Sequence, residues 1–341
     1  MATTFKTFLN DDVVSTRTLL HEAIPVTGTI VSGTYSDNNI KNFGHGIFQS
    51  VYDYPYLSSS ANHIFDIAVG YSPNSALSGA AGAVQEAKKI NMYNQMAQIL
   101  VGHDVTGGIL QFDADGDLIA GGNKLKEVVF LNFSRLLTKD EIKKDTFRLQ
   151  LGSGSTHADP FAATKTLGDY GAQNNFRTNS PAGEFAPLYT SSVNIVQDSG
   201  LGLIYYQAGI AVVSASVFGD VEFNSSGEDI DAVLTGSTIE TAADELRHRF
   251  LDLDFNNTTE LNSTIYFCRV NHNEFNYSAN PTYLSESKIR VKQNTVDTPV
   301  TYITTVGLYS ADNELLAVAK LSEPLKKDPT NELVLRVRLD Y

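Results

Sequence analysis

The sequence lacks the residues that most often cross-link a chain or hold a metal. Cys268 is its only cysteine, and tryptophan is absent. A single cysteine excludes an intrachain disulfide and any cysteine-rich metal site. The fold must therefore rest on its own core or on neighbouring subunits, which is typical of proteins that mature in a reducing compartment.

Signs of a membrane or nucleic-acid partner are also lacking. Residues 1–12 have neither the basic nor the apolar region of a signal peptide. The longest apolar stretch, Leu201–Phe218, contains Gln207 and two serines, which predicts two buried strands or one bent strand rather than a membrane helix. The formal charge of −14 repels phosphate backbones and anionic lipids. We expect neither nucleic acid nor membrane as a partner.

Patterns for catalysis and cofactor binding are missing as well. The seven histidines show no metal-ligand spacing, and no Gly-x-Ser-x-Gly elbow is present. The glycine-rich segment Leu151–Pro160 lacks the lysine and the following helix that a phosphate-binding loop requires. Cys268 lies in an apolar strand pattern, which favours a buried thiol over a nucleophile. We therefore expect no enzymatic activity, no catalytic residue and no cofactor.

Three closely spaced aspartates, Asp113, Asp115 and Asp117, are typical of the start of a calcium-binding loop. Such a loop requires glycine at its sixth position and glutamate at its twelfth. Here Gly116 stands fourth and Lys124 stands twelfth. The pattern fails at both places, so the segment predicts a tight β-hairpin turn and no metal site.

What the sequence has in quantity is short segments rich in β-branched and aromatic residues, bounded by Gly, Asn, Asp or Pro. Helical patterns are few. The fold class expected is mainly β (α+β): antiparallel sheets or a sandwich with a few short helices and long ordered loops. The helix predicted over Val84–Gly102 has Met92, Tyr93, Met96, Ile99 and Leu100 on its apolar face. Two further helices are predicted from capping boxes, Thr138–Lys144 from Thr138 and Glu141, and Ser237–Leu253 from Ser237 and Glu240. Predicted strands are Thr27–Tyr35, His63–Tyr71, Glu127–Arg135, Thr146–Gly152, Leu203–Phe218, Ser263–Val270, Ser287–Gln293, Val300–Tyr309, Glu314–Leu321 and Glu332–Tyr341.

Two long stretches, Gly152–Ser192 and Asn271–Ser287, show no clear periodicity. Loops of such length are seldom free in a compact domain, so we expect a partner to order them or recognition to take place on them. The first stretch suggests a division into an N-terminal α+β domain, 1–150, and a C-terminal mainly β domain, 151–341. A single intertwined domain is the alternative.

Tyrosine is plentiful, and five tyrosines are candidates for contacts with other proteins, because this side chain suits half-wet interfaces. Three cluster around Pro55 in the run Ser50–Ser59, and two lie near the C-terminal strands. The last strand, Leu333–Tyr341, has one apolar and one largely charged face, so it completes its own sheet or adds to a neighbour's edge. The interface candidates are Tyr52, Tyr54, Tyr56, Tyr309 and Tyr341.

The segment Thr301–Lys327 resembles a hairpin of tailed-phage tail and tail-fibre proteins. In it a Thr-x-x-Gly-Leu-Tyr strand, Thr304–Tyr309, is followed by a polar turn and by Leu-Leu-Ala-Val-Ala-Lys, Leu315–Lys320. Most of the remaining chain is similar to an uncharacterised group of virion structural proteins from contractile-tailed phages of marine bacteria. The segments that carry this similarity are Asp11–Tyr35, Phe48–Ser72, Lys88–Gly102, Val128–Lys143, Asn179–Tyr189, Gly202–Phe218 and Phe255–Leu284.

The resemblance implies a structural component of the virion, made in the host cytoplasm and built into the phage tail. The expected role is in the baseplate, where the chain binds neighbouring tail proteins or anchors fibres, with several copies arranged as a homo-oligomer. A receptor-binding or carbohydrate-binding tail module and a neck or capsid component are the alternatives. A wall-degrading enzyme would require a pair of carboxylates that the sequence does not single out.

Overall fold

The computed structural model describes residues 5–21, 26–29, 39–79, 85–119, 121–192, 199–236, 238–277, 284–285, 288–289, 296 and 299–341. The chain divides into two compact units, one formed by Leu20–Thr259 and the other by Met1–Leu19 with Glu260–Tyr341. The predicted boundary at residue 150 differs from this division, because it falls inside strand β8 (Arg148–Gly152) of the larger unit. The boundary between the units lies instead within two strands, β1 (Val13–His21) and β15 (Asn257–Val270).

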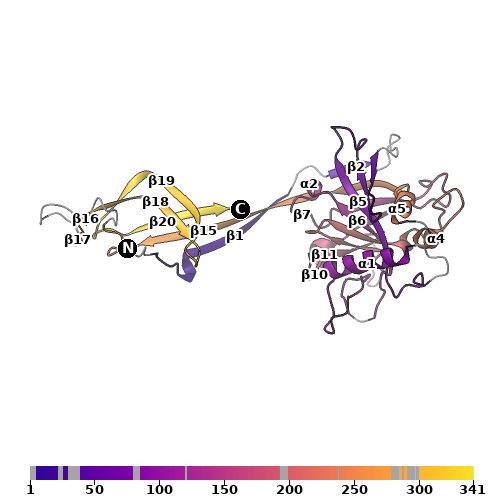
Figure 1. The fold of residues 1–341 in the computed structure, drawn as a ribbon, viewed down its shortest axis with the longest axis horizontal. Coiled ribbons are helices and arrows are strands. Elements are labelled where there is room, and N and C mark those ends of the chain that lie inside the picture. Colours follow the sequence, from indigo (N-terminus) through magenta and orange to yellow (C-terminus); the bar gives the residue numbers. More distant parts are fainter. Residues whose placement is uncertain are drawn as a thin grey trace. The chain divides into compact units, whose positions relative to one another are not determined.

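The larger unit is built on an antiparallel sheet with the strand order β10-β11-β12-β13-β6-β5-β4-β3 (Figure 1). Its middle strands are nearly all apolar, because both faces of the sheet are covered. The strands are β3 (Ile40–Asn42), β4 (Gln49–Tyr52), β5 (His63–Tyr71), β6 (Glu127–Phe133), β10 (Arg177–Ser180), β11 (Gly183–Leu188), β12 (Gly202–Tyr205) and β13 (Ile210–Ser214).

A second antiparallel sheet covers one face of the first and makes the larger unit a sandwich. Its order is β2-β14-β8-β9, with β2 at Val26–Thr29, β14 at Phe250–Phe255 and β9 at Thr164–Gly168. Phenylalanine rings pack between the two sheets. The ring centroid of Phe133 lies 5.7 Å from those of Phe147 and Phe255. This interface belongs to one continuous apolar core that lies wholly within the larger unit.

Helix α1 (Glu86–Leu100) covers the other face of the main sheet. It crosses β5 at Gly70, where an added Cβ would lie 2.8 Å from the carbonyl oxygen of Lys89 and 2.9 Å from the amide nitrogen of Tyr93. The helix was predicted correctly, and Met92, Tyr93 and Leu100 of the predicted apolar face are buried. Ile99 is exposed, and Lys89 and Ala97 take its place among the buried residues, so the predicted face was partly wrong.

The remaining helices are short. They are α2 (Arg135–Thr138), α3 (Ala172–Asn175), α4 (Ile230–Thr235) and α5 (Ile239–Arg247). The helix predicted over Thr138–Lys144 is wrong: Thr138 ends α2, and β7 (Glu141–Ile142) follows. The cause is Lys139, whose φ of 53° breaks the helix and turns the chain toward β15. For α5, Thr238 is the N-cap and accepts a bond from the Thr241 amide, while Ser237 lies outside the described residues.

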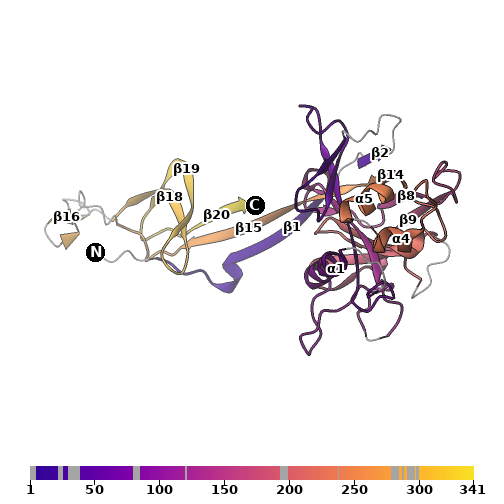
Figure 2. The ribbon, with the colours of Figure 1, turned by 45° about the vertical axis from the view of Figure 1, so that its right-hand side comes forward.

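The smaller unit holds a sheet in which β15 lies between β1 and β20 (Leu333–Asp340) (Figure 2). A separate hairpin pairs β18 (Thr301–Tyr309) with β19 (Leu315–Lys327), and β16 (Leu284–Ser285) pairs with β17 (Lys288–Ile289). The protein is thus mainly β with a few short helices, as the sequence predicts. The predicted strand at Thr27–Tyr35 is described only as far as Thr29, and part of Asn271–Ser287 lies outside the described residues.

The other long stretch, Gly152–Ser192, is not the irregular loop that its sequence predicts. It contains β9, α3, β10 and β11. Its first turn is held from within the chain, since the buried guanidinium of Arg249 donates 2.6 Å from Nη1 to the carbonyl of Gly154 and also bonds the carbonyl of Glu222.

Candidate interaction surface

The smaller unit buries very little of its apolar surface. Among its described residues, only Val270, Leu308 and Val337 are buried hydrophobic side chains. Its exposed large hydrophobic residues are far more numerous. They are Phe5, Phe8, Leu9, Val13, Val14, Leu19, Leu261, Phe275, Tyr277, Val296, Tyr302, Tyr309, Leu315, Leu316, Val318, Val334 and Tyr341. Exposed apolar side chains in such number on one unit are typical of an interaction surface.

The densest part of this surface lies on the β18–β19 hairpin. Its turn is tight because Asn313 adopts a φ of 65°, and the amide of Ser310 bonds the carbonyl of Glu314 at 2.8 Å. The β18–β19 register shifts beside Tyr309, so that Leu316 is the extra residue in β19. We call Tyr309, Leu315, Leu316 and Val318 the hairpin patch; Leu316 is 68% exposed and Val318 is 57% exposed.

Gly307 lets the hairpin patch lie flat. It is paired with Val318 across the hairpin, and an added Cβ would be 2.9 Å from the ring of Tyr309 and 3.3 Å from Leu315. The two side chains therefore lean over the glycine. The ring of Tyr309 also packs against Phe5, with centroids 4.7 Å apart, which brings the N-terminal segment to the rim of the patch.

In the described part of the smaller unit, the sheet of β1, β15 and β20 has two outer edges, one on β1 and one on β20. The final strand completes its own sheet: β20 pairs with β15 from Leu333 to Asp340. Tyr341 continues the ladder by exchanging backbone bonds with Asn262 at 2.8 and 3.0 Å, while its ring stays 72% exposed. The outer edges of β1 and β20 remain sites where a further strand can add.

The charges of the chain are divided unequally. Residues 1–19 and 260–341 contain eleven Lys and Arg and twelve Asp and Glu, for a net charge of −1, whereas residues 20–259 carry −13. Several charges of the smaller unit are paired within it, such as Asp12 with Arg269 and Arg17 with Glu260 at 2.5 Å. The hydrogen bond from the backbone amide of Leu9 lowers the pKa of Asp12 most, and the hydrogen bond from the Arg269 side chain lowers it further. The smaller unit is therefore nearly neutral, whereas the larger unit is strongly acidic.

The three tyrosines around Pro55 belong to the larger unit. Tyr52 is half-buried, with its ring 6.3 Å from that of Tyr56 and 5.4 Å from that of His63. Tyr54 is 58% exposed, and Leu57 beside this group is 86% exposed. The loop is stiffened by Asp53, which accepts bonds from the backbone and side chain of Asn62. These residues form a second, smaller apolar spot, whereas Tyr309 and Tyr341 belong to the smaller unit.

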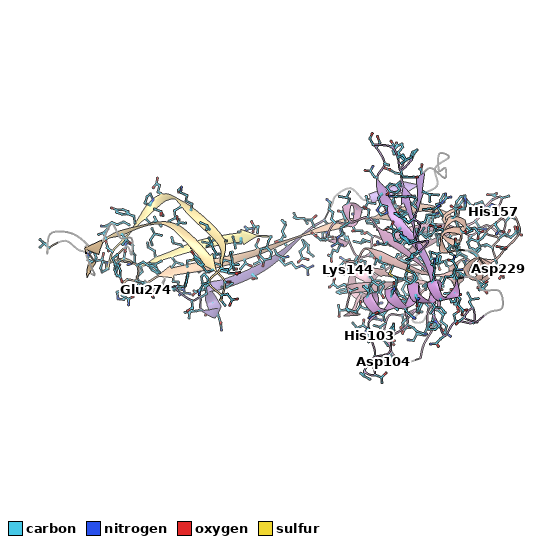
Figure 3. All side chains as sticks on the ribbon, in the orientation of Figure 1. His103, Asp104, Lys144, His157, Asp229 and Glu274 are labelled. Atoms are coloured by element: carbon cyan, nitrogen blue, oxygen red, sulfur yellow. The ribbon has the colours of Figure 1, made fainter. Side chains whose placement is uncertain are left out.

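Titratable side chains lie at several separate places in the described part of the chain. His103 and His157 lie at separate places of the larger unit (Figure 3). Burial, and then the nearby charge of Asp12, raises the pKa of the Cys268 thiol, so this group stays protonated at neutral pH. The one acidic cluster with metal-ligand spacing among these residues is Asp113, Asp115 and Asp117.

The hairpin patch was missed by the sequence analysis, apart from Tyr309. The signal was present in the sequence, because Leu315, Leu316 and Val318 place apolar side chains on both faces of one strand. A strand with one solvated face needs apolar side chains on its other face only. Among the described residues no helix is both long and apolar enough to span a membrane. Comparison with protein-family models, with curated proteins and with solved structures finds no match to this chain.

Proposed function

We propose that this chain is a structural protein of a phage virion, a tail component of the baseplate that assembles with copies of itself and with neighbouring tail proteins. One observation carries the proposal: the smaller unit exposes its apolar strands and lacks an apolar core of its own among the described residues. A unit of about a hundred residues with so little buried area gains its stability from subunit contacts. The resemblance of Thr301–Lys327 to tail-fibre hairpins points the same way.

A second copy of this chain is the occupant that the surface fits best. Two copies of the smaller unit meet almost without charge repulsion, since each carries −1, and their hairpin patches and strand edges are self-complementary. The larger unit, with −13, disfavours the same contact between copies. Self-association is therefore directed to the smaller unit, and the acidic units are left for contacts with other proteins.

The test is the oligomeric state of the full chain, measured by light scattering and native mass spectrometry across a wide range of concentrations. We expect a closed oligomer that dissociates on dilution. A variant with Leu316→Glu and Val318→Glu should be monomeric at concentrations where the wild type is assembled. Leu136→Glu is the control, because Leu136 is also exposed but lies on the larger unit. A wild type that stays monomeric throughout contradicts self-assembly.

Hydrogen exchange of the wild type keeps the test decisive if the double variant misfolds. Amides of β18 and β19 should exchange slowly in the oligomer and quickly after dilution, while β5 and β6 stay protected in both. The virion assignment has its own test, which is the position of the chain in purified particles by electron cryomicroscopy. Density at the distal end of the tail supports the baseplate, whereas absence of the chain from the particle refutes a virion role.

A further inference from the structure

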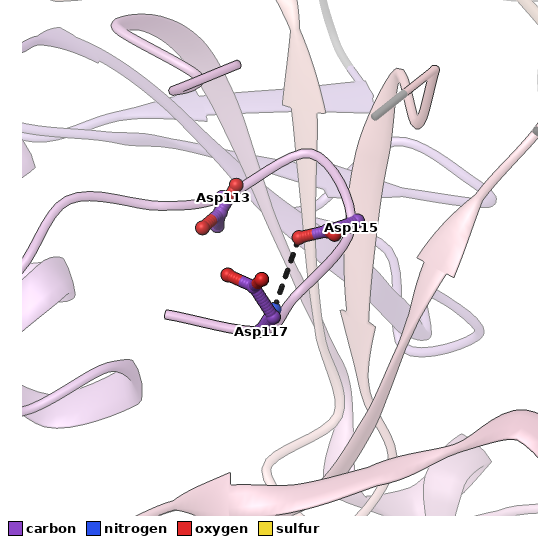
Figure 4. A group of neighbouring side chains, drawn as sticks. All are labelled: Asp113, Asp115 and Asp117. Atoms are coloured by element: carbon purple, nitrogen blue, oxygen red, sulfur yellow. Dashed lines mark hydrogen bonds between the residues drawn. The ribbon is translucent and has the colours of Figure 1, made fainter. Parts of the chain in front are cut away.

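The turn that follows Phe112 brings three carboxylates together in the larger unit. Asp113, Asp115 and Asp117 each offer an oxygen, and these oxygens lie within 4.8 Å of one another. Figure 4 shows the three carboxylates turned toward one another from a single turn, with the Asp117 amide bonded to Asp115 Oδ1 at 3.1 Å. Two ligands on opposite sides of a calcium ion, each at 2.3–2.6 Å, are about 4.6–5.2 Å apart. The separation therefore suits one shared ion.

The backbone of the turn follows the course of a calcium loop more closely than its sequence indicates. Counting from Asp113, the aspartates occupy positions one, three and five, and Ile119 occupies position seven, where such loops use a carbonyl. The sixth residue, Leu118, has a φ of 60°, in the left-handed region that glycine normally fills at this position. Glycine is required at the sixth position of a calcium loop because it adopts this left-handed conformation readily. In this chain Leu118 adopts the conformation instead.

The turn is held in place by the adjacent strand. Asn179 of β10 donates from Nδ2 to the carbonyls of Gly116 and Asp117, at 3.2 and 3.1 Å. An added Cβ at Gly116 would be 2.8 Å from the ring of Phe185 in β11, so the turn packs directly on the sheet. The carboxylates are thus positioned before any ligand arrives.

The charge of the cluster is only partly compensated. Asp113 is 1% exposed; its Oδ2 is paired with the ammonium of Lys124, but its Oδ1 has no hydrogen-bond partner among the described residues. A buried carboxylate oxygen without a donor is rare in native proteins, and a bound ion is one arrangement that satisfies it.

We propose that Asp113, Asp115 and Asp117, with the carbonyl of Ile119, bind a calcium ion. The ligands are all hard oxygens, and the orphan Oδ1 of Asp113 is the atom that gains most from a divalent cation. Calcium fits better than magnesium, because three carboxylates and a carbonyl from one turn suit its larger and less regular coordination shell better than the near-ideal octahedron that magnesium demands.

Lys124 is the internal competitor of this ion. Its ammonium contacts Asp113 Oδ2 and, at 2.6 Å, the carbonyl of Ile119, which are the ligands of positions one and seven. Calcium binding displaces the ammonium toward the open cavity of about 560 Å³ that Lys124 lines together with Asn74, Gln111 and Lys126. Because this exchange opposes binding and the twelfth-position glutamate is absent, we expect a weak site, with a Kd on the order of 10⁻⁴–10⁻³ M.

The experiment uses the full chain, stripped with a chelator and then titrated with calcium chloride at constant ionic strength. Binding is followed by calorimetry and by thermal unfolding. If the Kd is about 1 mM, a calcium concentration of about 10 mM shifts the folding equilibrium of the larger unit about elevenfold. Magnesium at the same concentration should shift it less. Absence of any calcium effect on the wild type overturns the proposal.

Three variants sharpen the result. Asp117→Asn keeps the side-chain bond to the Ile119 amide but removes one charge, and calcium affinity should fall about tenfold or more. Lys124→Gln removes the competitor and should raise affinity. Asp312→Asn is the matched control, because Asp312 lies in the similar turn of the β18–β19 hairpin without the other two aspartates, and it should behave as wild type. Binding by Lys124→Gln alone shows that the ammonium fills the site and also overturns the proposal.

Discussion

The hydroxyl of Tyr206 donates a hydrogen bond of 2.9 Å to Oδ2 of Asp169, and neither residue is exposed to solvent. Asp169 also accepts bonds from the amides of Asp145 and Phe147 and from the guanidinium of Arg148 at 2.9 Å. It thereby fixes the start of β8, which in turn carries the sheet opposite the main one. Burial outweighs these bonds and raises the pKa of Asp169 to about 6.

This raised pKa predicts a pH dependence of stability. Because the folded pKa lies above the unfolded value of 3.8, the contribution of Asp169 is greatest at low pH and is lost as the pH rises through about 6. The loss should amount to about 3 kcal/mol. Urea unfolding of the wild type and of Asp169→Asn at pH 4 and pH 7 measures it, and the gap between the two proteins should narrow at the higher pH. A gap that widens would show that the four donors stabilise the carboxylate more than burial opposes it.

The contact of α1 with β5 predicts a steric effect at Gly70. Alanine there would push against the backbone of Lys89 and Tyr93, so we expect Gly70→Ala to lower the free energy of unfolding by about 1–3 kcal/mol. Gly44→Ala is the control, because its Cβ would have no neighbour within 4 Å and should leave stability unchanged or slightly higher. Equal effects of the two substitutions in urea titrations would refute a close helix–sheet contact.

Arg249 predicts a local effect in the stretch that follows β8. Lysine cannot reproduce the planar fork that bonds the carbonyls of Gly154 and Glu222 over the ring of Phe223. Arg249→Lys should therefore destabilise the larger unit by about 2–4 kcal/mol and expose residues 153–163 to limited proteolysis. Arg135→Lys is the control, since Arg135 is exposed and donates a single bond to the carbonyl of Gln207. Unchanged proteolysis would mean that other contacts order this stretch.

Tyr309 in the hairpin patch and Tyr54 in the loop around Pro55 give different predictions for self-association. Tyr309→Ser removes a ring from the hairpin patch and should raise the dissociation constant of the oligomer about tenfold or more. Tyr54→Ser, in the larger unit, should leave it unchanged. Sedimentation equilibrium of both variants makes the comparison. The reverse result would assign the interface between copies to the tyrosine loop around Pro55.

Local sequence patterns predicted much of this fold because they act through neighbouring residues. The hairpin at Asn313 follows from its Asp-Asn turn, and the two strands found in Leu201–Phe218 are one of the two alternatives that the sequence left open there. The capping-box pattern at Thr138 failed because Lys139 turns the chain into a strand pairing with residues more than a hundred positions away. No sequence pattern pointed to Asp169 or Arg249, since only the folded chain brings their hydrogen-bond partners together.

The same distinction explains what the sequence shows of the candidate sites. The spacing of Asp113, Asp115 and Asp117 is visible in the sequence, but the left-handed Leu118 and the unpaired oxygen of Asp113 are not. The hairpin patch depends on which face of β19 the rest of the chain leaves open. The sequence places Leu315 and Leu316 on a strand, and only the three-dimensional arrangement shows that both are exposed.

The pairing of β1 with β15 has a consequence in time. A ribosome that adds about 5–20 residues per second needs roughly 10–50 s to travel from one strand to the other. Throughout that interval β1 has no partner, while the sandwich of Leu20–Thr259 is synthesised and can fold. The surface proposed to join copies is thus the last part of the chain to form. In the proposed assembly, a chain whose synthesis has not passed residue 318 lacks the hairpin patch and therefore cannot join other copies.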